Sequence, residues 1–70
     1  MLYYWVSMQA PRDIKLAKKI IEKLNTIAIN GVGWDFEFIF KIKKEDWEKI
    51  AEICVIHCLN GSVIGESDTI

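Results

Sequence analysis

The chain has few of the residues on which disulfide, metal and nucleophile chemistry depend. Its 70 residues include two cysteines, one histidine and one proline. Two cysteines cannot build a disulfide framework, so we expect a reducing compartment, the cytoplasm, or the host cytoplasm if a phage encodes the chain. No apolar stretch approaches the roughly 20 residues that span a bilayer, and the first residues lack the features of a signal peptide. We therefore expect no membrane partner.

Apolar residues are abundant by contrast. They make up 51% of the chain, and eight residues are aromatic. This content excludes intrinsic disorder, and four glycines with one proline exclude a collagen-like or linker sequence. A chain of this length has room for one small domain, which we expect to span residues 1–70.

The first half of the chain predicts a strand followed by a helix. Residues 2–8 are apolar on both alternating faces, which is typical of an inner strand. Pro11 then suits the first position of a helix whose apolar residues recur in steps of three and four. If Asn25 ends this helix, residues 26–30 form a short strand and residues 31–33 its turn; otherwise Asn30 and Gly31 cap a longer helix. We prefer the first alternative because Asn25 is a poor helix former and β-branched residues follow it.

The second half predicts a strand, a helix and a last short strand. Residues 34–43 alternate strictly, with one apolar face (Trp34, Phe36, Phe38, Phe40 and Ile42). Ile39 lies on the opposite face of this strand. The helix that follows has a predicted inner stripe of Trp47, Ile50, Ala51, Cys54, Val55 and Cys58. Asn60 and Gly61 are expected to close it, before a strand over residues 62–65.

The predicted order is therefore strand, helix, strand, strand, helix, strand. This order indicates an α+β fold, a small two-layer sandwich of the ferredoxin-like βαββαβ type. The alternative is a three-stranded sheet with two helices, which omits the short second strand.

Cys54, His57 and Cys58 are the only residues with soft-metal or nucleophile character. Helical spacing places them on one side of a helix, but the chain has no further histidine or cysteine to complete a zinc site. Both thiols come late in their helix, where its dipole disfavours a thiolate. Gly31 and Gly33 precede a strand, whereas a phosphate loop precedes a helix. We expect no metal, no cofactor and no catalytic residue.

Charge is unevenly distributed along the chain. Residues 1–33 carry five basic and two acidic side chains, a net charge of +3, whereas residues 34–70 carry four basic and eight acidic ones, a net charge of −4. Arg12, Lys15, Lys19 and Lys23 form a basic ridge opposite the apolar stripe of the first helix. The ridge is either an ordinary solvated face or a surface that steers a charged partner.

Function follows only by elimination. One histidine and no paired catalytic groups argue against an enzyme, and a compact chain without a linker is typical of a stand-alone inhibitor or regulator, such as phage and mobile elements encode against host defence enzymes. We expect a protein partner, a homodimer, and binding through Arg12, Lys15, Lys19, Lys23 and Ile39. An exposed apolar patch on the sheet, made of Tyr3 or Tyr4, Trp5 or Val6, and Ile39, carries the homodimer prediction. The alternatives are nucleic-acid binding through the basic ridge and ligand sensing between two subunits.

Overall fold

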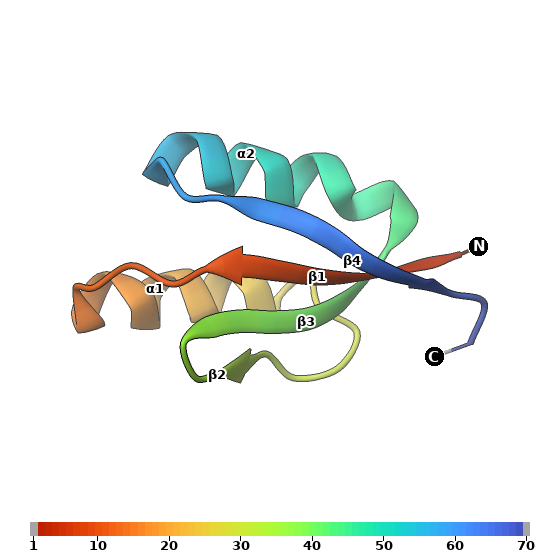
Figure 1. The fold of residues 1–70 in the computed structure, drawn as a ribbon, viewed down its shortest axis with the longest axis horizontal. Coiled ribbons are helices and arrows are strands. Elements are labelled where there is room, and N and C mark those ends of the chain that lie inside the picture. Colours follow the sequence, from red (N-terminus) through yellow and green to blue (C-terminus); the bar gives the residue numbers. More distant parts are fainter. Residues whose placement is uncertain (1, 70) are drawn as a thin grey trace.

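The computed structural model describes residues 2–69 and shows the elements in the order βαββαβ (Figure 1). They are β1 (Tyr3–Gln9), α1 (Ile14–Asn25), β2 (Gly33–Trp34), β3 (Glu37–Lys43), α2 (Trp47–His57) and β4 (Gly61–Ser67). A short 3-10 turn, Lys44–Asp46, leads from β3 into α2. The predicted α+β class is confirmed. A second strand exists, but it is the two-residue β2 and not the predicted strand over residues 26–30.

The four strands form one sheet in the order β2-β3-β1-β4. Every neighbouring pair is antiparallel. As predicted, β1 is an inner strand, and it pairs along its whole length with β3. Each helix therefore joins two strands that have a third strand between them.

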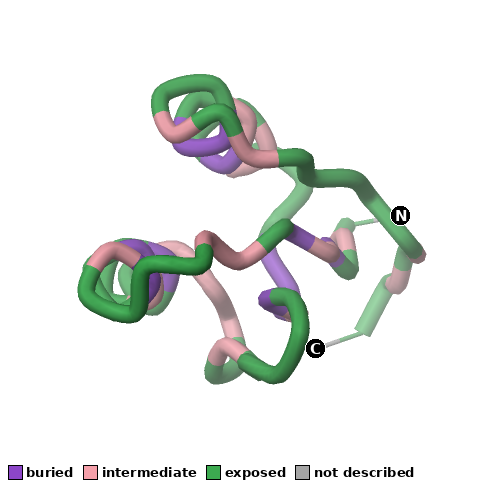
Figure 2. The backbone as a smooth tube through the Cα atoms, turned by 60° about the vertical axis from the view of Figure 1, so that its left-hand side comes forward, coloured by how far each residue is buried: buried purple, intermediate pink, exposed green. Residues whose placement is uncertain are grey.

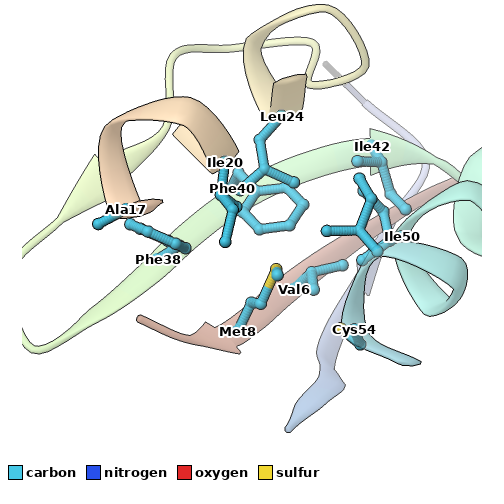
Figure 3. Close-up of a cluster of buried hydrophobic side chains, with 11 residues drawn as sticks. Val6, Met8, Ala17, Ile20, Leu24, Phe38, Phe40, Ile42, Ile50 and Cys54 are labelled. Atoms are coloured by element: carbon cyan, nitrogen blue, oxygen red, sulfur yellow. The ribbon is translucent and has the colours of Figure 1, made fainter. Parts of the chain in front are cut away.

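Both helices cover the same face of the sheet, which gives two layers (Figure 2). The strands turn alternate side chains toward the helices, so that Val6 lies opposite Phe40 and Met8 opposite Phe38. All four are fully buried. The core is completed by Ile42 of β3, by Ala17, Ile20 and Leu24 of α1, and by Ile50, Ile53 and Cys54 of α2 (Figure 3).

Helix α1 begins later than the sequence predicts. Its first residue is Ile14 rather than Pro11, and its N-cap is Asp13, whose carboxylate accepts the backbone N–H of Lys15 at 2.9 Å and of Leu16 at 3.4 Å. The helix begins directly after Asp13 because this carboxylate pairs with two backbone N–H groups of the first turn, whereas Pro11 has no side chain that could accept them. The preferred end of the helix at Asn25 is confirmed.

The predicted strand over residues 26–30 and its turn at residues 31–33 are wrong. Backbone N–H groups of Ile27 and Ala28 still donate to Leu24, so the chain leaves α1 through a turn. Only Ile29 reaches β3, where its N–H donates to the Lys41 carbonyl at 2.8 Å. The hairpin instead turns between β2 and β3, and Phe36 at its tip is 92% exposed.

Two predictions for α2 are also wrong. Val55 is 78% exposed and Cys58 is exposed, whereas Ile53, which the predicted stripe omits, is buried. The helix ends at Cys58 in the left-handed conformation (φ 54°, ψ 43°), so Asn60 and Gly61 do not cap it. Gly61 is the first residue of β4, which is longer than the predicted strand over residues 62–65.

Candidate protein-binding surface

Three of the four residues predicted to form the basic ridge lie on α1. Lys15, Lys19 and Lys23 are exposed along that helix. Arg12 is also exposed but precedes the N-cap, so the helix does not fix its direction. The ridge as predicted from helical spacing is therefore shortened by one residue.

A groove runs between the two helices on the side of the molecule away from the sheet. Two adjoining hollows of about 550 Å³ and 130 Å³ share Lys23 and Ile53, and together they make what we call the inter-helix groove. Its α1 side consists of Leu16, Lys19, Ile20, Lys23, Thr26 and Ile27. Its α2 side consists of Lys49, Glu52, Ile53, Ile56 and His57.

The inter-helix groove combines an apolar floor with a basic rim. Ile20 and Ile53 are buried at its base, and the side chain of Ile56 is 65% exposed beside them. Lys19 and Lys23, one helical turn apart, form no ion pair with any carboxylate of the described residues. A carboxylate brought to this rim would therefore meet ammonium groups that are not already neutralised.

The α2 side of the rim is closer to neutral. Lys49 forms an ion pair with Asp46 at 3.2 Å, and Glu52 also lines the inter-helix groove. The positive charge of the rim is thus concentrated on α1, at two of the residues that the sequence predicts as a binding ridge.

The second candidate surface is the open face of the sheet, which no helix covers (Figure 2). Tyr3 and Trp5 of β1 lie on this face, as does Ile39 of β3. The register settles the two alternatives left by the sequence, because Tyr4 and Val6 face the helices. Trp5 is 37% exposed, and Ile39 is half-buried.

Lys41 organises this open face. Its ammonium group lies 5.5 Å from the centre of the Tyr3 ring and 5.4 Å from that of the Trp5 ring, and it donates a hydrogen bond to the carbonyl of Thr69. The lysine is only 4% exposed. The C-terminal segment thus reaches back over the sheet, and the cation holds both aromatic rings in place.

The basic ridge and Ile39 do not form one site. α1 and its lysines lie in the helix layer, whereas Ile39 lies on the opposite face of the sheet. Sequence reasoning also missed Lys49, Ile53 and Ile56 as groove residues. The run of apolar residues from Ile53 to Ile56 indicates an apolar surface on α2, but it does not show which side of the helix faces α1.

Cys54, His57 and Cys58 do not come together as a site. Cys54 is buried on the sheet-facing side of α2, and its burial raises the pKa of its thiol. Cys58 is exposed at the helix end. Residues 2–69 contain no group of three or more histidine, cysteine and acidic side chains arranged to hold a metal ion.

Comparisons with known proteins found no match to a family model, to a curated protein or to a solved structure. Neither helix in the described part of the chain is long and apolar enough to cross a membrane.

Proposed function

We propose that this protein is a non-enzymatic protein-binding module, a small cytoplasmic inhibitor or regulator of the phage or mobile-element type that acts by covering a surface of its partner. The observation that carries the proposal is the inter-helix groove, in which exposed Ile56 lies among aliphatic side chains bordered by Lys19 and Lys23 of α1. Protein interfaces commonly have such an apolar centre with a polar rim.

The open face of the sheet supports a homodimer. Tyr3, Trp5 and Ile39 present apolar surface there, and a second copy packed sheet to sheet would remove it from water. Burial of this kind also adds stability to a domain whose own core is small. In such a dimer the helix layers face outward, so the lysines of α1 remain accessible to a partner.

The homodimer is tested by light scattering at micromolar concentration. We expect a dimer for the unmodified protein and a monomer for Ile39→Lys, because the substitution places a charge in the buried contact. Val55→Lys is the matched control, since Val55 is exposed on α2 away from the sheet. A monomer in all three samples would refute the dimer.

Occlusion is tested with the captured partner. Affinity capture from the source organism, followed by mass spectrometry, identifies the partner, and the activity of the purified partner is then titrated with this protein. We expect activity to fall in proportion to added protein until the two are equimolar. An undiminished activity at saturation would refute an inhibitory role.

Nucleic-acid binding through Lys15, Lys19 and Lys23 is the alternative function. It predicts binding to random duplex or single-stranded DNA that weakens steeply as salt rises. The inter-helix groove favours a protein partner, because His57 is the one aromatic side chain among its lining residues and its floor is aliphatic.

A further inference from the structure

We infer that the inter-helix groove receives an acidic amphipathic α-helix from the partner protein. The inference rests on the proposed function and adds the chemistry of the segment that is bound. In this groove aliphatic side chains lie beside the unpaired lysines of α1, whereas the α2 side carries Glu52 and the ion-paired Lys49. An occupant must therefore be apolar on one side and negatively charged along the flank that faces α1.

Charge complementarity selects the sign of the occupant. Lys19 and Lys23 are four residues apart, so they lie on one side of α1 and face a bound segment together. Lys15, one turn earlier, extends the same positive strip beyond the groove. Carboxylates spaced by one helical turn on the partner would match this strip, whereas a basic segment would be repelled.

The lack of hydrogen-bond acceptors among the floor side chains favours a bound helix over an extended segment. An extended peptide brings unpaired backbone N–H groups to the floor, and each one needs an acceptor there. The floor consists of Leu16, Ile20 and Ile53, whose side chains accept no hydrogen bond. A helix satisfies its backbone internally and presents apolar side chains at positions i, i+3, i+4 and i+7, as other helix-in-groove complexes do.

The length of the groove fits a short helix. Leu16 and Lys23 are two helical turns apart, a distance of about 10 Å along α1. The groove continues past the end of α1 to Ile27, and its α2 side runs from Lys49 to His57. A partner helix of three to four turns would therefore lie between α1 and α2 as a third helix of the outer layer.

Binding of a synthetic peptide tests the inference directly. The probe is a fluorescent peptide of about 14 residues, roughly 21 Å as a helix, with leucines at i, i+3, i+4 and i+7 and glutamates at the flanking positions. The control peptide has lysines in place of the glutamates. We expect fluorescence anisotropy to show saturable binding of the acidic peptide and none of the basic one. Equal binding of both, or no binding of the acidic peptide at about 1 mM, would overturn the inference.

Variants of the protein locate the site. We expect the double variant Lys19→Glu/Lys23→Glu to weaken binding of the acidic peptide at least about tenfold, a change of about 1.4 kcal/mol. Lys18→Glu is the matched control, because Lys18 is an exposed lysine of the same helix that does not line the groove. We expect it to change binding less than about twofold, since a solvent-exposed charge away from the contact is largely screened.

The exposed apolar part of the groove has its own pair of variants. Ile56→Ser removes an exposed groove side chain and should weaken peptide binding about fivefold, whereas Val55→Ser, at an exposed position outside the groove, should not. Urea unfolding of each variant checks that the fold is kept. Equal losses for the two substitutions would overturn the inference.

Capture of the intact partner protein by the same variants distinguishes this inference from the proposed function. Loss of partner capture with Lys19→Glu/Lys23→Glu, but not with Lys18→Glu, supports both. Capture that survives the double variant leaves the proposed function standing and overturns the groove as its binding site. Binding of random single-stranded DNA at these lysines, without binding of the acidic peptide, would overturn the inference in favour of a nucleic acid.

Discussion

Gly61 is the position where one added methyl group should damage the fold. It lies at the start of β4 beneath α2, and a Cβ placed there would be 2.7 Å from the Sγ atom of Cys54. Ordinary van der Waals contact needs about 3.5–4.0 Å, and Cys54 is buried in the core, so its sulfur has little room to move. Gly61 has no positive φ, so backbone strain does not contribute. The whole effect should come from this one contact.

The expected cost of Gly61→Ala is the difference of two terms. Overpacking a core site costs about 1–3 kcal/mol, whereas alanine reduces the entropy of the unfolded chain and returns about 0.4–1 kcal/mol. We therefore expect a net loss of about 1–2 kcal/mol in the free energy of unfolding, measured by urea denaturation followed by far-UV circular dichroism. For a domain of this size, that corresponds to a fall in Tm of at least about 4 °C.

Gly65→Ala is the matched control in the same strand. A Cβ on Gly65 would lie 3.8 Å from the Trp5 Cβ, which is normal contact. Only the entropy term applies there, so stability should stay unchanged or rise by up to about 1 kcal/mol. A loss at Gly65 as large as that at Gly61 would show that alanine is disfavoured in β4 generally, and would refute the explanation by contact.

A double-mutant cycle identifies the atom responsible. Cys54→Ala removes the sulfur and should cost about 1 kcal/mol by itself, because it leaves a small cavity. In Gly61→Ala/Cys54→Ala the new methyl group occupies part of that space, so the double variant should be more stable than the sum of the single losses by about 1–2 kcal/mol. Strictly additive losses would mean that the methyl group clashes elsewhere.

Three further predictions concern the core, the first helix and the thiols. Phe38→Ala should cost about 3–5 kcal/mol in urea unfolding, because Phe38 is fully buried, and Ile39→Ala on the open face should cost far less. Asp13→Ala should lower the free energy of unfolding by about 1 kcal/mol through loss of the N-cap, whereas Asp13→Asn should keep most of that stability. A thiol reagent should modify Cys58 quickly and Cys54 only on unfolding. Because the pKa of Cys54 is raised in the folded state, stability should fall as pH rises above its ordinary value near 9.0, and Cys54→Ala should lose this dependence.

Alternation of residue types predicted the faces of β3 correctly but not where the strand begins. Trp34 pairs with Phe38 across the hairpin, and pairing places both on the same face of the sheet. The alternation of Trp34, Phe36 and Phe38 is thus equally compatible with one continuous strand and with a hairpin that turns at Phe36. The turn residues, Asp35 and Phe36, include neither glycine nor proline, so the sequence does not mark the turn. The period of two could not have located the turn.

The inner face of α2 was underdetermined for a different reason. Four consecutive residues, Ile53 to Ile56, are apolar, so hydrophobic periodicity permits several inward directions. Packing against the sheet selects Ile53 and Cys54, and this choice turns Val55 outward and Ile56 toward α1. In α1, by contrast, a lysine-rich face opposes a narrow apolar stripe. Its lysines were predictable from the sequence, whereas the groove that they border was not.

The positions of the two surfaces determine what a dimer could do. Ile39 and the inter-helix groove lie on opposite sides of one sheet, so the lysines of α1 cannot guide a partner onto Ile39 of the same chain. If two copies pack through their open faces, their grooves point in opposite directions and both remain accessible. Such a dimer would hold two partner helices, and a partner with two copies of the helix would bind it with avidity. Ile39→Lys should then abolish avidity while leaving the affinity of a single acidic peptide unchanged, whereas Lys19→Glu/Lys23→Glu should weaken both.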